Sequence, residues 1–345
     1  MDQPRHWSFI ETNAYSGNNA RAAILNTTGP HPVIYAAGNA GNGANPQPDA
    51  IIIGTGAQIL SPEQRPESAQ TPDTPTPVAS FNITQLGDPA DKIGKDTNFN
   101  ALAIHNNVFY FTKGSGGNGI NTVYFLDTTG TACPHGVGVP SADAQLPTSG
   151  IPYDPTKIQT QGVTPYNMCV LQGFPTALKT TTFFPSGLWF ADDNTLYVTQ
   201  QGDGLAFTNT KKQKTGGLQK WTRQANGSWK LAYTVQSGLN LGTPYTVPGY
   251  PTGNNPVTGQ PWTPATDGLR AITGRHNPDG SVTLYATTAA ISGSGDNGAD
   301  PNKLVALTDQ PAATFPAVNE AFTGLRNAQA GEVLRGVSLT PTRAW

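Results

Sequence analysis

Charged residues are scarce in this sequence. Asp, Glu, Lys and Arg make up 12% of its 345 residues, about half the fraction usual in globular proteins, and the formal net charge is −2. The densest basic cluster, KKQK at 211–214, is typical of a solvated hairpin tip. Binding of nucleic acid requires a basic stripe, so we expect no nucleic-acid partner.

Long apolar runs are also missing. No stretch has the length needed to span a membrane as a helix, so we expect no membrane span. The opening residues, MDQPRHWSF, lack the apolar segment of a signal peptide. Two interpretations stay open: the protein is cytosolic, or a signal peptide has been removed.

Only two cysteines occur, Cys133 and Cys169. They flank a Pro- and Gly-rich insertion, residues 134–167, in which strand signals are few. A disulfide that closes this loop would contribute roughly 4 kcal/mol in the loop-entropy model. The alternative is two buried thiols. We predict the disulfide, because a long irregular loop needs a covalent link, and a disulfide favours an extracellular or periplasmic location.

Common catalytic motifs are absent. The sequence contains no HxxxH or HExxH motif and no cysteine pair with zinc spacing, which argues against a transition-metal enzyme. It also lacks the G-x-S-x-G elbow of α/β-hydrolases and the G-x-x-x-x-G-K-[ST] phosphate loop. The sequence therefore names no reaction by motif.

Turn-forming residues are abundant, and they punctuate a repeat. Gly (39) and Pro (30) make up one fifth of the chain, and no ten-residue stretch shows helical spacing. Four segments share one form, in which a strand with a central Tyr follows another strand and precedes a Gly- and Asn-rich loop. The Tyr-containing strands are PVIYAA (32–37), NVFYFT (107–112), TLYVTQ (195–200) and VTLYAT (282–287).

Each of the four units can be completed to four strands. The strands expected before the Tyr strand are 21–26, 99–106, 185–192 and 269–277. The third strands are expected at 50–55, 122–127, 218–223 and 303–308, and the fourth at 79–86, 168–174, 229–235 and 320–325. Repeated units of four short strands predict an all-β fold, a β-propeller of four-stranded blades that spans residues 1–345 as one domain.

The ends of the sequence suggest a further blade. VLRGVSL (333–339) reads as a fifth innermost strand, with HWSFIETN (6–13) as its outer partner, so that the termini build a closing blade. No middle strands are visible for this blade. Either the chain lacks N-terminal blades of a longer parent protein, or the insertions at 57–78, a Pro-rich loop, and 134–167 supply extra strands.

Several segments resemble a known group of proteins. NAYSGNNARAAILN, GNAGNGANPQPDAIIIGTGAQIL, GLWFADDNTLYV and GEVLRGVSLTP are similar to segments of secreted, uncharacterised bacterial β-propeller-like proteins, and the similarity covers nearly the whole chain. The resemblance implies secretion and additional N-terminal sequence. It implies no reaction and no site residues.

A candidate site follows from aligning the expected inner strands. A polar or acidic residue stands three positions before an Arg or Asn in four of them, and the remaining unit has Ser186 instead. The pairs are Asn18 and Arg21, Thr97 and Asn100, Asp267 and Arg270, and Glu332 and Arg335. Three arginines near one axis suit carboxylate, sulfate or phosphate groups. We therefore predict Arg21, Asn100, Arg270 and Arg335 as ligand-binding residues at the channel mouth.

Three functional hypotheses fit this pattern. In the first, the protein is an extracellular hydrolase or lyase that acts on an anionic carbohydrate or small molecule, with Asp267, Glu332 or His105 as acid or base. In the second, the carboxylates pair with arginines and the protein is a non-catalytic scaffold that binds a glycan or a protein. In the third, incomplete blades pair between chains and the protein self-assembles.

One loop carries a calcium-like pattern. In GDNGAD, glycine separates Asp296 and Asn297 from Asp300, and oxygen ligands of this kind suit Ca²⁺. Asp296 and Asp300 are therefore candidate calcium ligands, and Ca²⁺ is the single cofactor that the sequence suggests. The alternative is an ordinary polar hairpin loop, because no EF-hand pattern is met.

Overall fold

The computed structural model describes residues 20–30, 32–38, 57–60, 79–81, 99–114, 120–133, 136–147, 168–177, 182–205, 215–295 and 298–340. Within these ranges the chain is all-β, with no helix, and so nothing that could cross a membrane as a helix. The chain divides into two compact units, residues 1–179 and 180–345. The expectation of one propeller domain stays a prediction.

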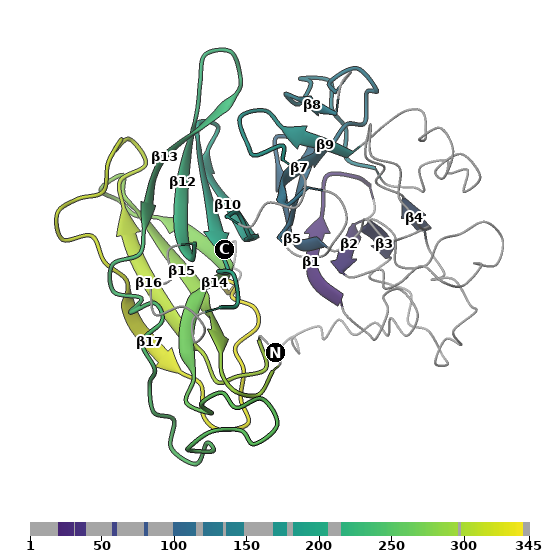
Figure 1. The fold of residues 1–345 in the computed structure, drawn as a ribbon. Helices are drawn as coiled ribbons and strands as arrows, with labels where there is room; N and C mark the ends of the chain where they lie inside the picture. The colour runs from purple at the N-terminus through teal and green to yellow at the C-terminus, as the bar shows by residue number, and fades with distance from the viewer. Residues whose placement is uncertain are drawn as a thin grey trace, which may run out of the picture. The chain divides into compact units, whose positions relative to one another are not determined.

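Unit 1 holds two sheets, sheet 1 antiparallel and sheet 2 mixed (Figure 1). Sheet 1 consists of β1 (Ala20–Asn26), β2 (Val33–Gly38), β3 (Ala57–Leu60) and β4 (Ala79–Phe81), in that order. Sheet 2 consists of β5 (Phe99–His105), β6 (Val108–Lys113), β7 (Thr122–Leu126), β9 (Met168–Leu171) and β8 (Val137–Gly138), in that order, with β8 parallel to β9.

Unit 2 holds two sheets of four strands each. Sheet 3 consists of β10 (Pro185–Asp192), β11 (Thr195–Gln200), β12 (Gly217–Arg223) and β13 (Trp229–Val235). Sheet 4 consists of β14 (Ala265–His276), β15 (Val282–Ile291), β16 (Lys303–Asp309) and β17 (Thr323–Asn327). In both sheets, strands that follow one another in sequence are neighbours.

The four tyrosines of the repeat occupy the second strand of the four sheets, as predicted. Tyr35 pairs with Ile24, and Tyr197 pairs with Trp189, both on the first strand of the same sheet. Tyr110 and Tyr285 pair in the same way with their first strands. In sheets 1 to 3 every residue of the second strand is buried, as expected for a strand covered on both faces.

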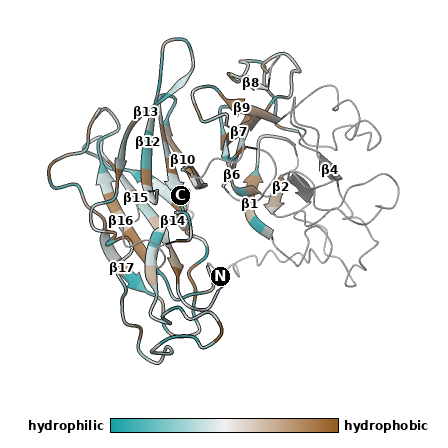
Figure 2. Cartoon of the chain, in the orientation of Figure 1, coloured by the Kyte–Doolittle hydropathy of each residue, from teal (hydrophilic) through white to brown (hydrophobic). Residues whose placement is uncertain are grey.

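Sheets 3 and 4 approach each other closely through their first strands, β10 and β14. A Cβ atom added to Gly187 would lie 2.4 Å from the Arg270 carbonyl oxygen and 2.7 Å from Thr199 Oγ1, so glycine is required for this approach. The core between these sheets contains Tyr197, Leu284 and Leu307. Figure 2 shows the apolar residues of β15 and β16 in brown.

One strand prediction in unit 1 needs correction. The third strand of sheet 1 was expected at 50–55, but β3 is Ala57–Leu60, which falls inside the expected Pro-rich loop at 57–78. The sequences at 50–55 and 57–60 are both rich in apolar residues and lie next to each other. Composition therefore could not tell which of them is the third strand, and the pairing with β2 identifies 57–60. The insertion at 134–167 supplies the extra strand β8, as one of the two alternatives drawn from the sequence predicted. Residues 50–55 lie outside the described part.

The expected closing strand at 333–339 is not formed, since residues 333–340 are described and belong to no strand. A side-chain amide holds this segment instead. Asn302 Oδ1 accepts from the Leu334 N–H at 2.7 Å, and Asn302 Nδ2 donates to the Leu334 carbonyl oxygen at 2.8 Å. These two bonds satisfy the backbone N–H and carbonyl groups of Leu334 alone. A strand would need backbone hydrogen bonds to a neighbouring strand along its whole length. The proposed partner at 6–13 lies outside the described residues.

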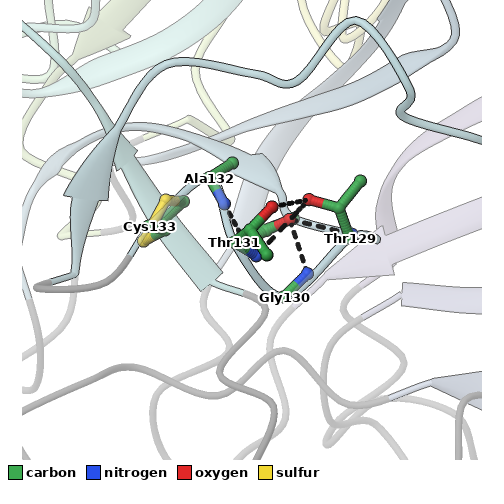
Figure 3. The surroundings of a disulfide bond; sticks show 7 residues. Thr129, Gly130, Thr131, Ala132 and Cys133 are labelled. Atoms are coloured by element: carbon green, nitrogen blue, oxygen red, sulfur yellow. Dashed lines mark hydrogen bonds between the residues drawn. A yellow bond between two sulfur atoms is a disulfide. The ribbon is translucent and has the colours of Figure 1, made fainter.

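The predicted disulfide is confirmed. Cys133 and Cys169 are bonded, with their Cα atoms 5.8 Å apart. Figure 3 shows the turn from Thr129 to Cys133 beside the disulfide. Asp127 shapes this turn: its Oδ1 accepts from the Thr129 and Gly130 N–H groups at 2.9 and 3.0 Å, and its Oδ2 accepts from the Ala132 N–H at 2.9 Å. The disulfide therefore joins a structured turn to β9.

Candidate functional site

In unit 1 the aligned positions of the first strands lie side by side. Arg21 of β1 donates from Nη1 to Asn100 Oδ1 of β5 at 2.6 Å. The Arg21 side chain is exposed. Two residues that the sequence predicted as ligand-binding are thus brought together on neighbouring sheets. Residues 15–19 and 96–98, which precede these strands and include Asn18 and Thr97, lie outside the described residues.

In unit 2, Ser186 occupies the matching position on the first strand of sheet 3, β10, and its hydroxyl group bonds to the backbone of β14. Ser186 Oγ donates to the Leu269 carbonyl oxygen at 2.8 Å and to the Arg270 carbonyl oxygen at 3.3 Å. Thr199 Oγ1 also donates to the Arg270 carbonyl oxygen. The backbone at Arg270 is therefore fixed by hydroxyl groups of sheet 3.

The Arg270 side chain turns toward the loop after β15. A Cβ atom added to Gly298 would lie 1.9 Å from Arg270 Nη1, so the guanidinium rests directly on the Gly298 backbone. Gly298 has φ +122°, a conformation that side chains rarely adopt. Glycine at 298 therefore gives the guanidinium its space.

Asp267 is buried, with 2% of its surface exposed. Its Oδ2 accepts from the Gly204 N–H at 2.8 Å, and Gly202, at φ +91°, lies so close that a Cβ atom there would be 2.2 Å from the same oxygen. The segment after β11 thus wraps the carboxylate. A proton-transferring group must reach its substrate, and this enclosure leaves Asp267 poorly placed for that role.

Glu332 and Arg335 lie outside the sheets. Glu332 accepts from the Gln329 N–H at 3.1 Å and pairs with Arg326 at 3.2 Å, in an exposed ion pair. The Gln329 N–H, together with the Arg326 guanidinium, holds the pKa of Glu332 below its usual value. Arg335 is exposed. Because Arg21 belongs to unit 1 and Arg270 and Arg335 to unit 2, the convergence of the three arginines stays a prediction.

His105 ends β5, before a hairpin turn. Asn106 and Asn107 both have positive φ, 49° and 60°, which is the conformation of a two-residue type I′ turn. His105 pairs with Val108 across this turn. The structure therefore places His105 at a hairpin end, five positions along β5 from Asn100.

The candidate calcium ligands are only partly described. Asp300 is buried and Asp296 lies outside the described residues. Within the described ranges no group of three or more His, Cys, Asp or Glu side chains is arranged to hold a metal ion. A metal site here would have to draw on other oxygen ligands.

Sequence reasoning missed a buried polar cluster between sheets 3 and 4. Lys220 Nζ of β12 lies 3.0 Å from Asp309 Oδ2 at the end of β16, and each side chain is 1% exposed. Tyr197 and Tyr233 both donate to Asp309 from their hydroxyl groups. Burial, together with Asp309, raises the pKa of both tyrosines. The signal in the sequence was a lysine inside an expected strand, directly before Trp221.

The ammonium group of Lys220 also anchors a loop. It donates to the carbonyl oxygens of Gln310 and Ala313 at 2.5 and 2.9 Å. Every element of this cluster is therefore engaged in holding sheet 3 to sheet 4, and we assign the cluster a structural role.

Comparison with known proteins adds no functional information: no protein-family model matches the chain, and no curated protein matches it.

Proposed function

We propose that the protein is an extracellular β-propeller that binds an anionic carbohydrate or small molecule without turning it over. The observation that carries this proposal is the hydrogen bond from Arg21 to Asn100. This bond joins the first strands of sheets 1 and 2, β1 and β5, and supports the adjacent packing of first strands that a propeller requires. Arg21 itself is exposed on β1. Guanidinium groups bind carboxylate and sulfate through paired hydrogen bonds.

Three features support the propeller arrangement. Sheets 1, 3 and 4 are built from strands in sequential order, and sheet 2 departs from it at β8 alone. The second strands of sheets 1 to 3 are fully buried, and the first strands are in contact within each unit. Successive blades of a propeller share these properties, because the first strands converge on the channel. In this proposal the four sheets are successive blades.

A binding role is favoured over catalysis by the state of the candidate acids and bases. Asp267 is enclosed by backbone, and Glu332 has a lowered pKa in an exposed ion pair. General acid–base catalysis works best when the pKa lies near the operating pH. Neither carboxylate meets both requirements of access and pKa.

The disulfide supports the extracellular part of the proposal. Cys133 and Cys169 are bonded, and structural disulfides persist in oxidising compartments. An extracellular or periplasmic location is therefore the one that we propose.

Binding is tested by isothermal titration calorimetry of the full chain with polygalacturonate and dextran sulfate, and with neutral dextran for comparison. We expect binding to one of the charged polymers and none to neutral dextran. Arg21→Gln should weaken the binding about tenfold, which is the effect of losing a hydrogen bond to a charged group. Arg335→Gln is the second variant, because this side chain is also exposed.

Arg275→Gln is the matched control, because Arg275 is exposed at the far end of β14 and contacts the Tyr285 ring. This variant should bind as the unaltered chain does. If the two charged polymers bind no better than neutral dextran, the proposal is wrong. If either polymer is shortened during incubation, as measured by size-exclusion chromatography, the catalytic alternative replaces it.

A further inference from the structure

The long segment between β13 and β14 fastens the loop that joins β15 to β16. Asn255 Nδ2 and Thr258 Oγ1 both donate to the Gly293 carbonyl oxygen, at 2.7 and 2.8 Å. Tyr245 donates from its hydroxyl to the Pro301 carbonyl oxygen at 2.6 Å. The loop is thus fixed near both of its ends by side chains from another part of unit 2.

Asp300 lies within this fastened loop, and its carboxylate is buried, with the residue 1% exposed. Oδ1 accepts from the hydroxyl groups of Tyr250 and Ser292 at 2.7 and 2.6 Å. Oδ2 is also buried, but in the described part of the chain it has no hydrogen-bond partner. One oxygen of the carboxylate is therefore fully satisfied and the other is not.

Asp300 forms no ion pair with the cations that are near it in the fold, among the described residues. Lys303 Nζ lies 3.8 Å from the centre of the Tyr245 ring, and neither Lys303 nor Arg270 forms an ion pair with Asp300 among the described residues. Burying a carboxylate without a charged partner is strongly unfavourable, and hydrogen bonds from two hydroxyl groups offset only part of that cost. The missing interaction is therefore a cationic one.

We propose that Asp300 is a ligand of a bound calcium ion. The polar atoms around it are oxygens, namely its own carboxylate and the hydroxyls of Ser292 and Tyr250. Ca²⁺ takes six to eight oxygen ligands in flexible geometry and accepts carboxylates, carbonyls and water, whereas Mg²⁺ demands a near-ideal octahedron. With one carboxylate in the described part, we expect an affinity of about 0.1–1 mM, the range of extracellular modules.

Thermal unfolding of the full chain, freed of divalent ions with a chelator, tests this proposal. At a Ca²⁺ concentration about 100 times Kd, the Tm should rise by about 5 °C or more, because the ion binds the folded state alone. Asp300→Asn keeps the shape of the side chain and removes its charge, so the shift should vanish. Asp192→Asn, at an exposed turn, is the matched control and should keep the full shift.

A second readout does not depend on the stability of the Asp300 variant. Tb³⁺ replaces Ca²⁺ at oxygen sites, and its luminescence is excited through a nearby aromatic ring such as that of Tyr250. We expect sensitised luminescence that Ca²⁺ displaces, and a severalfold weaker response in Ser292→Ala, which removes one hydroxyl from the carboxylate. The proposal is overturned if Ca²⁺ leaves the Tm of the unaltered chain unchanged, or if Asp300→Asn shifts as much as the control.

Discussion

At the scale of single residues, a lysine ammonium and a carboxylate meet in the interior between sheets 3 and 4. Lys220 and Asp309 lie 3.0 Å apart, and the hydroxyl groups of Tyr197 and Tyr233 complete the shell of the carboxylate. A buried ion pair often stabilises a protein no more than apolar residues of the same volume would. Removing one partner is nevertheless strongly destabilising, because the other charge stays buried without a partner. The cluster therefore makes unit 2 sensitive to single substitutions here.

Replacing Asp309 by Asn should lower the free energy of unfolding by about 3–5 kcal/mol, because the Lys220 ammonium would remain buried without a counter-charge. Urea unfolding followed by tryptophan fluorescence measures the loss. The control is Asp192→Asn at an exposed turn, for which a change of less than about 1 kcal/mol is expected. Equal effects of the two substitutions would contradict the structural role of the pair.

Gly187→Ala should destabilise the protein by about 1–3 kcal/mol, because the added methyl group would overlap the Arg270 carbonyl oxygen and force β10 away from β14. The midpoint of urea unfolding reports this loss. Gly324→Ala on β17 is the comparison, since a Cβ atom there meets nothing within 4 Å. A Gly187→Ala variant as stable as the unaltered chain would show that the two strands are not in close contact.

Tyr35 and Tyr197 could be predicted because the same strand pattern recurs in every unit. Asp309 follows no repeat, and its partners come from distant segments that meet only after folding, so it could not be predicted. Asp300 was named from the pattern of its loop, but its bond to Tyr250 comes from another segment and could not be predicted. Arg21 and Asn100 were aligned correctly through the register of the first strands, and their hydrogen bond follows from that register.

At the scale of elements, the disulfide links the turn before β8 to β9 across a separation of 36 residues. Replacing both cysteines by serine should lower the free energy of unfolding by about 4 kcal/mol, through loss of the constraint on the unfolded chain. Denaturant unfolding with and without a reductant gives the measurement. The reductant should destabilise the unaltered chain alone and leave the double variant unchanged.

The segment 333–339 offers a second test at this scale. Only Leu334 has a backbone N–H bonded to Asn302, so hydrogen exchange should be slow at Leu334 and fast at its neighbours Val333 and Val337. Asn302→Ala should abolish the protection at Leu334. Slow exchange along the whole segment would instead mean that it pairs as a strand, as the sequence alone suggested.

Strand boundaries were most accurate beside short turns. The expected strands at 185–192 and 229–235 match β10 and β13 at both ends, and a short turn follows β10 and another precedes β13. The third strand of sheet 1 was misplaced because two apolar runs compete for one position beside β2. An extra strand in the insertion at 134–167 was one of the alternatives, but the position of β8 could not be predicted because its pairing depends on β9, which lies far along the chain.

At the scale of the whole molecule, the sequential strand order of sheets 1, 3 and 4 was predictable because neighbouring strands follow one another along the sequence with turn residues between them. A single compact domain of 345 residues should have a radius of gyration of about 20 Å. Small-angle X-ray scattering of the full chain measures it, and a single symmetric distance distribution is expected for a propeller. A larger radius with two maxima would mean that the two units tumble separately, which the propeller proposal does not allow.

The position of Asp309 at the end of β16 has a consequence for synthesis on the ribosome. Sheet 3 is complete in sequence once β13 has emerged, but the Lys220 ammonium then has no counter-charge until β16 follows. The nascent sheet 3 must keep that lysine hydrated and delay its final packing. During synthesis, sheets 3 and 4 would thus complete their folding together rather than one after the other. A nascent chain stalled before β16 should therefore remain sensitive to protease within β12.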